Sequence, residues 1–85
     1  MSKNQMQGVD SRSEREIFGQ NFREARMRIR LSQRDVHRKT GVAQSHISEI
    51  ETGISNISID TMVKLSRTVN RPLWKLFKPK PTKTE

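Results

Sequence analysis

Apolar residues recur at helical spacing along the chain, and no segment alternates between apolar and polar residues as a β-strand does. Four of them are separated by four, three and four residues, on one face of a helix: Phe18, Phe22, Ala25 and Ile29. This stripe predicts a first helix that begins near Ser13 and runs to about Ile29. Glu16 follows Ser13 at the spacing typical of a capping box.

Residues 32–41 predict a second, shorter helix that ends in a tight turn. Ser32 is a favourable N-cap, and Asp35 follows three residues later. Val36 is the inward-facing residue. The helix should end at Thr40, because Gly41 readily adopts the left-handed conformation that terminates helices.

Residues 44–52 predict a third helix with two different faces. Ile47 and Ile50 face inward, and Gly53 ends the helix. The opposite face carries polar side chains at Gln44, Ser45, Ser48, Glu49 and Thr52. This helix has no Lys or Arg, which is unusual in a chain with 17 such residues.

The last third of the chain predicts two further helices. The fourth should run from its N-cap Ser58 to Val69, with Asn70 as a left-handed cap. Its buried stripe comprises Ile59, Met62, Leu65, Ser66 and Val69. A short fifth helix should follow Arg71, with Pro72 at its first position, where the missing N–H does no harm. The predicted fold class is therefore all-α, a compact five-helix bundle.

A chain of 85 residues holds one domain, which we place at residues 13–77. Residues 1–12 are polar and lack periodicity, so they are predicted to form a disordered tail. Residues 78–85 contain Lys and Pro in alternation, and they predict an extended, mobile, basic tail.

The predicted fifth helix is more apolar than a short helix can bury against itself. Leu73 and Phe77 should complete the core. Trp74, with Arg71 and Lys75 nearby, is a candidate dimer contact, because aromatic residues and Arg are enriched at such interfaces. The alternative is a Trp74 side chain buried in its own core.

The formal net charge of +8 indicates a polyanionic partner, nucleic acid before an anionic membrane surface. The absence of cysteine excludes disulfides and thiolate metal sites, and His37 and His46 alone are too few for a zinc site. No apolar run approaches the ~20 residues of a membrane span, and the N-terminus lacks the apolar core of a signal peptide. We expect no cofactor, no metal, no enzyme activity and no membrane partner, and a cytoplasmic protein that is associated with the nucleoid when bound to DNA.

The second and third helices together have the chemistry needed to read double-stranded DNA. The major groove is about 12 Å wide and admits one helix, which a preceding helix and a tight glycine turn can hold in place. Candidate base contacts come from the third helix: Gln44, Ser45, His46, Ser48 and Glu49. Candidate phosphate contacts surround it: Gln33, Arg34, Arg38, Lys39, Arg23 and Thr52.

Several short motifs resemble those of one family. They are FGQNFR at 18–23, LSQ at 31–33, Gly41, QSHIS at 44–48 and IETG at 50–53. This set resembles the helix-turn-helix of lambda-repressor-like, Cro/CI-type (XRE family) proteins, and the resemblance covers about residues 14–77. It implies a five-helix DNA-binding domain of a kind that usually dimerises on palindromic operators.

The resemblance also implies roles for single residues. Arg26 and Glu51 match a family pair that forms a buried ion pair between the first and third helices. Gln33 would contact phosphate and brace Gln44.

Three positions depart from the family pattern. His37 stands where the family usually has Ala, at the contact between the second and third helices. Ala43 replaces the usual Ser or Thr N-cap of the third helix, at a cost of about 1 kcal/mol. Arg30 occupies a position commonly held by Gly, which predicts backbone strain or a longer first helix.

The expected function is that of a homodimeric transcription regulator, a repressor or dual controller, on a palindromic operator. The alternative is an antitoxin of the same fold that binds a toxin partner and its own promoter. Non-specific packaging of nucleic acid through charge alone is a further alternative. A membrane-surface helix is disfavoured, because the basic residues are spread over several short helices.

Overall fold

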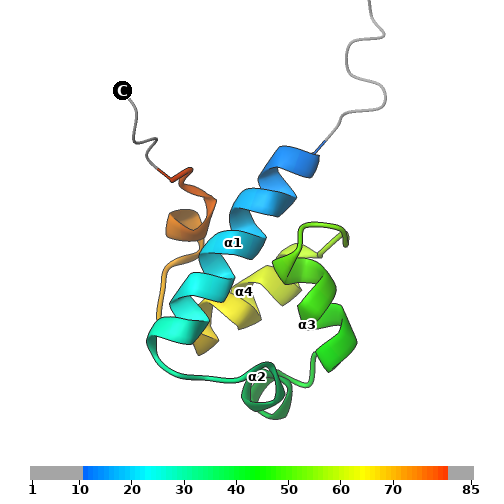
Figure 1. The fold of residues 1–85 in the computed structure, drawn as a ribbon, viewed down its shortest axis with the longest axis vertical. Coiled ribbons are helices and arrows are strands. Elements are labelled where there is room, and N and C mark those ends of the chain that lie inside the picture. Colours follow the sequence, from blue (N-terminus) through cyan, green and yellow to red (C-terminus); the bar gives the residue numbers. More distant parts are fainter. Residues whose placement is uncertain (1–10, 81–85) are drawn as a thin grey trace, which may run out of the picture.

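Four α-helices and one short 3-10 helix make up the part of the chain that the structure describes, residues 11–80 of a computed structural model (Figure 1). The elements are α1 (Arg12–Arg28), α2 (Gln33–Thr40), α3 (Gln44–Glu51), α4 (Ile59–Thr68) and the 3-10 helix η2 (Leu73–Phe77). The all-α class is confirmed. Residues 1–10 and 81–85, where most of the two predicted tails fall, lie outside the described residues.

The first helix begins near Ser13 as predicted, but the predicted capping box at Ser13 is wrong. Helical hydrogen bonding begins before Ser13, because the Arg15 N–H already donates to the Ser11 carbonyl at 3.0 Å. Ser11 occupies the N-cap position without capping through its side chain. Its hydroxyl instead accepts a hydrogen bond from the Arg15 guanidinium at 2.8 Å. Ser13 therefore lies inside the first turn, and the capping box with Glu16 does not form.

The first helix ends within one residue of the predicted Ile29, but the predicted burial of Ile29 is wrong. α1 ends at Arg28, and Ile29 is 41% exposed rather than part of the buried stripe. The cause lies in the next residue, because Arg30 has a left-handed φ of 63° and turns the chain away from the helix axis. The strain that the sequence predicts at Arg30 is thus present in the backbone.

The predictions for α2 and its turn are confirmed. The Ser32 hydroxyl accepts a hydrogen bond from the Asp35 N–H at 2.9 Å, and the Asp35 carboxylate accepts one from the Ser32 N–H at 2.8 Å. These two bonds form a capping box. The helix ends at Thr40, and Gly41 has the left-handed φ of 81°.

This capping box should make part of the stability of the protein dependent on pH. The Ser32 backbone N–H and the Arg38 guanidinium, which donate to the carboxylate, lower the pKa of Asp35 from 3.8 to about 2. Because the pKa of the folded state is the lower one, this stabilisation is complete above pH 3.8 and is lost as the pH falls toward about 2. Asp35→Asn should therefore flatten the acid limb of the stability profile in urea melts across this window. Identical acid limbs for the two proteins would contradict the assignment.

Both predicted caps of α4 are confirmed, but one residue of its predicted buried stripe is exposed. The Ser58 hydroxyl accepts from the Thr61 N–H at 3.1 Å, and Asn70 has a left-handed φ of 59°. Leu65 is fully buried, whereas Ile59 is 61% exposed. The prediction for Ile59 is wrong, because Ile57 and Met62 on either side of it pack against the core while Ile59 itself faces solvent.

The predicted fifth α-helix is a single 3-10 segment, and Pro72 is its N-cap rather than its first residue. The segment is confined between Pro72 and Pro79, and the residue before a proline is biased away from the α region. Lys78 accordingly has an extended backbone, with ψ of 124°. Short stretches of this kind commonly take the 3-10 form.

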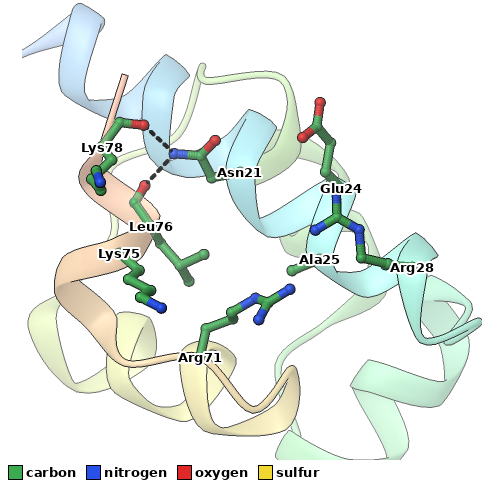
Figure 2. A pocket seen from close by; sticks show the side chains of 8 residues that line it. All are labelled: Asn21, Glu24, Ala25, Arg28, Arg71, Lys75, Leu76 and Lys78. Atoms are coloured by element: carbon green, nitrogen blue, oxygen red, sulfur yellow. Dashed lines mark hydrogen bonds between the residues drawn. The ribbon is translucent and has the colours of Figure 1, made fainter. Parts of the chain in front are cut away.

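Asn21 ties the end of the described chain to α1. Its side-chain amide donates to the Leu76 carbonyl at 2.9 Å and to the Lys78 carbonyl at 2.8 Å (Figure 2). Lys80 is paired with Glu24 on the next turn of α1. η2 and the residues after it are therefore held along one side of α1.

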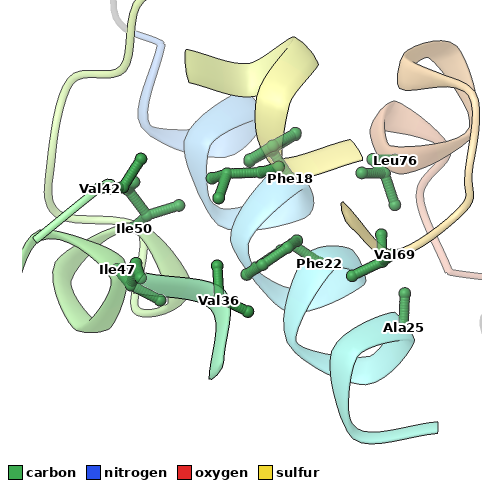
Figure 3. Close-up of a cluster of buried hydrophobic side chains, with 10 residues drawn as sticks. Phe18, Phe22, Ala25, Val36, Val42, Ile47, Ile50, Val69 and Leu76 are labelled. Atoms are coloured by element: carbon green, nitrogen blue, oxygen red, sulfur yellow. The ribbon is translucent and has the colours of Figure 1, made fainter. Parts of the chain in front are cut away.

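One hydrophobic cluster joins all five elements (Figure 3). Its buried members are Phe18, Phe22, Ala25, Val36, Val42, Ile47, Ile50, Leu65, Val69 and Leu76. Leu76 is the fully enclosed residue of η2, while Leu73 and Phe77 are half-buried and pack against the cluster from outside. The ring of Phe77 lies 5.4 Å from that of Phe18, so η2 closes the core over α1.

The backbones of α1 and α3 make a very close approach at Gly19. A Cβ atom at this position would lie 2.1 Å from the Ile50 carbonyl oxygen and 3.1 Å from the Glu51 carbonyl. A separation of 2.1 Å is far inside any van der Waals contact, so only glycine fits here. This glycine sets the distance between α3 and the helix that supports it.

Candidate nucleic-acid interface

α3 presents a polar face to solvent while its other face is locked into the core. Ile47 and Ile50 are completely buried. The polar side chains of the outer face are exposed: Gln44, Ser45, Ser48 and Glu49. Within residues 11–80, no hydrogen bond involves the side chains of Gln44, Ser45 or Ser48. These donors and acceptors therefore have their full hydrogen-bonding capacity for a ligand.

His46 differs from Gln44, Ser45 and Ser48 because its side chain already has a hydrogen-bond partner. Its side chain is half-buried, and Nδ1 lies 3.2 Å from the Ser55 hydroxyl in the loop after α3. The same nitrogen lies 3.9 Å from the Glu49 carboxylate. His46 thus links the loop to Glu49 and supports the outer face from its edge.

The N-terminus of α3 has no side-chain cap. Ala43 is the N-cap residue and makes no capping hydrogen bond. The first backbone N–H groups of the helix are therefore left to solvent or to an anion, and the positive end of the helix dipole favours an anion. The departure at Ala43 lowers the stability of α3 but leaves its N-terminus accessible.

The candidate phosphate contacts lie on α1, on α2 and at the end of α3. Arg34, Arg38 and Lys39 are exposed on α2, and Arg38 pairs with Asp35 at 2.6 Å. Arg23 projects from α1 with 57% of its side chain exposed. Thr52 is less available, because its hydroxyl already donates to backbone carbonyls in the last turn of α3, at 3.0 and 3.2 Å.

A buried ion pair joins α1 to α3 behind the polar face. Arg26 Nε donates to Glu51 Oε2 at 2.6 Å, and Nη2 donates to Oε1 at 2.9 Å. Arg26 and Glu51 are only 8% and 6% exposed. The remaining Arg26 donor, Nη1, reaches the Leu31 carbonyl at 2.8 Å. The pair is bidentate and well satisfied, so it holds α3 at a defined angle to α1.

Glu51 also holds two of the candidate phosphate contacts. The Gln33 amide donates to Oε1 at 3.1 Å, and Arg23 Nε lies 3.8 Å from the same oxygen. The expected brace between Gln33 and Gln44 is not what the structure shows, because Gln33 is committed to the carboxylate. Glu51 therefore positions one side chain from α1 and one from α2 at the C-terminal end of α3.

His37 connects the two helices of the motif through the turn between them. Its Nδ1 lies 2.8 Å from the Val42 carbonyl. The imidazole is exposed rather than wedged between α2 and α3. The departure from alanine is therefore accommodated at the surface.

The candidate dimer contacts lie on η2, apart from the polar face of α3. Trp74 is 63% exposed, so the alternative in which it fills its own core is wrong. Lys75 Nζ lies 5.7 Å from the centre of the Trp74 ring, within reach of a cation–π interaction. Arg71 is half-buried just before η2.

Sequence reasoning missed the residues that support the polar face from behind. The Gln33–Glu51 and His46–Ser55 contacts join positions 18 and nine residues apart, and no local pattern marks them. Gly19 gave a weak indication of the close approach between α1 and α3, because a glycine inside an otherwise helical stretch often has a packing reason.

The described residues hold no group of three or more His, Cys, Asp or Glu side chains that could bind a metal ion. None of the helices at 12–77 has the length and apolar character of a membrane span.

The fold and this face define a helix-turn-helix DNA-binding unit, in which α2 and its glycine turn support an exposed reading helix. Comparison with known proteins agrees, because the profile of the helix-turn-helix family matches residues 22–73. The chain belongs to this family, and it is a DNA-binding transcription regulator of the lambda-repressor-like (XRE) type. No protein of curated function matches its sequence significantly.

Two solved structures are similar. One is the restriction-modification controller protein C.AhdI from Aeromonas hydrophila, with a TM-score of 0.71 and 29% identity over 76% of this chain and 98% of that chain. The other is a hypothetical transcription factor, NHTF, from Neisseria, with a TM-score of 0.74 and 22% identity over 84% of this chain and 82% of that chain.

Proposed function

We propose that the protein recognises one DNA sequence by inserting α3 into the major groove. The observation that carries this proposal is the exposed face of α3, where Gln44, Ser45 and Ser48 have uncommitted side chains. Gln44 can make two hydrogen bonds to adenine, and Glu49 can accept one from cytosine. Serine hydroxyls can contact several bases.

Affinity in this proposal comes from the cations beside α3 rather than from α3 itself. Arg34, Arg38 and Lys39 contact phosphates on one side, while Arg23 and Gln33 do so from the position that Glu51 gives them. Each neutralised phosphate releases counterions, so binding weakens steeply with salt. α3 has no Lys or Arg, so it adds discrimination with little sequence-independent attraction.

We further propose a homodimer on a palindromic operator. The large exposed Trp74 side chain is the strongest candidate for a two-fold contact, with Arg71 and Lys75 at its edge. A two-fold pair would place two α3 helices in successive major grooves, about 34 Å apart. The likeness to C.AhdI, a controller protein, supports a role as repressor or dual controller.

Selection of binding sites from random DNA tests this function. The expected result is a two-fold symmetric motif, which would follow from direct reading by a dimer. Gln44→Ala should relax the preference at one position of each half-site, at a cost of about 1–3 kcal/mol. Lys39→Ala is the matched control, because loss of a phosphate contact lowers affinity for all sequences alike. A flat selection profile for the unmodified protein would overturn the proposal and leave only charge-driven binding.

A further inference from the structure

An open groove of about 320 Å³ lies between α1 and η2 (Figure 2). Its floor contains Ala25 and Leu76. Four cationic residues line it: Arg28, Arg71, Lys75 and Lys78. Figure 2 shows that the side chains of Arg28, Arg71 and Lys75 extend toward the hollow from opposite sides.

The charges of this groove are not balanced. Its acidic residue is Glu24, and Glu24 is already paired with Lys80. Among residues 11–80, no carboxylate lies within ion-pair distance of the four groove cations. Like charges that face one hollow repel one another, and a bound anion would remove that repulsion.

The groove lies on the opposite side of α1 from the DNA-reading helix. Gly19 and Arg26 contact α3, and they are seven residues apart on one face of α1. Asn21 and Arg28, also seven residues apart, line the groove, and helical geometry places them on the far face. A duplex that contacts α3 is therefore separated from the groove by the full thickness of α1.

We infer that this groove, defined by Arg28, Arg71, Lys75 and Lys78, docks an acidic segment of a partner protein. Charge complementarity identifies the occupant as an extended stretch rich in Asp and Glu. The position behind α1 keeps the groove clear of a duplex bound at α3, and Arg28 and Lys78 lie outside the proposed dimer contacts. This inference therefore does not require the proposed operator reading to be correct.

The test uses a fluorescein-labelled poly-glutamate peptide and the full chain, with and without bound duplex. The expected result is that the peptide binds equally well in both states, and that peptide addition shifts backbone NMR signals of α1 and η2. Arg28→Glu with Lys78→Glu should weaken peptide binding about tenfold, since each lost contact and each new repulsion contributes separately. These two residues are exposed and are not among the proposed dimer contacts, so dimerisation and folding serve as internal checks.

The matched control makes the same charge change on α2. Arg34→Glu with Lys39→Glu should weaken DNA binding and leave peptide binding intact. Three outcomes would overturn the inference: displacement of the peptide by duplex, an equal loss of peptide binding in both double variants, or NMR shifts confined to α2 and α3. Binding of single-stranded DNA to the groove in preference to the peptide would identify a nucleic-acid site instead and would equally overturn it.

Discussion

Glu51→Ala should lower the free energy of unfolding by about 3–5 kcal/mol, because it leaves the Arg26 guanidinium buried without its counter-charge. Both members of the pair are less than a tenth exposed, and both oxygens of Glu51 are hydrogen-bonded. For a domain of this size, each kcal/mol corresponds to a fall in Tm of about 4–8 °C. The variant should therefore melt at least about 12 °C below the unmodified protein, as measured by circular dichroism.

Glu49→Ala is the matched control, because it removes the same kind of side chain from the exposed face of the same helix. This substitution should change the free energy of unfolding by no more than about 0.5 kcal/mol. The variant protein should instead change its base preference at one operator position. Glu51→Ala should also release Gln33 and Arg23, so its DNA affinity should fall even at temperatures where it is fully folded. Equal and small shifts in Tm for the two variants would contradict the role assigned to the ion pair.

Gly19→Ala should destabilise the protein by about 1–3 kcal/mol, although the same change in an ordinary helix stabilises it. Replacing a mid-helix glycine by alanine gains about 1 kcal/mol through helix propensity. Here the added Cβ would lie 2.1 Å from the Ile50 carbonyl oxygen, and a backbone atom cannot move aside as a flexible side chain can. α3 must then shift away from α1, and steric repulsion outweighs propensity. Urea melts measure the loss of stability.

Gln20→Ala is the control for this prediction, because Gln20 is the exposed neighbour of Gly19 on the same helix. It should leave both stability and DNA affinity close to those of the unmodified protein. Gly19→Ala should weaken DNA binding as well, since the shift of α3 moves its polar face relative to the cations on α2. A Gly19→Ala protein that is more stable than the parent would show that α1 and α3 do not approach as closely as described.

The parts of the fold that were predictable from the sequence are those governed by local chemistry. Ser32, Gly41, Ser58 and Asn70 act as caps because their own side chains or backbone preferences favour that conformation. Ser13 has the same local signal but lies inside the helix, since Arg12 and Ser11 continue the hydrogen-bonding pattern toward the N-terminus. Competing local signals of similar strength cannot be ranked without the rest of the fold.

Errors in burial concentrate where helices end. Ile29 and Ile59 fit the apolar stripes, yet both are exposed, because one follows the last turn of α1 and the other opens the first turn of α4. Periodicity gives the direction in which a side chain points, but it does not say whether the core extends that far. The prediction of a fifth α-helix is wrong for a related reason. A segment confined between two prolines is too short to complete α-helical turns.

The candidate site divides in the same way. The polar face of α3 follows from helical spacing alone, and the Arg26–Glu51 pairing from resemblance to the family. The groups that hold this face in place depend on contacts between distant parts of the chain. Two examples are the hydrogen bond from Gln33 to Glu51 and the one between Ser55 and His46. Only the three-dimensional arrangement reveals them.

Val36 is the one buried side chain of α2, and a hydrogen bond from Gln33 to Glu51 adds a polar contact with α3. A helix of eight residues with one buried side chain has little intrinsic stability of its own. Its amides should therefore exchange with solvent hydrogen through local opening well before those of α1, whose five buried residues anchor it. The cations of α2 would reach phosphates only while α2 is folded and packed on the domain, so contact with DNA would suppress its local opening. Part of the binding free energy would then be spent on ordering α2, and slowed exchange there would be an early sign of occupancy.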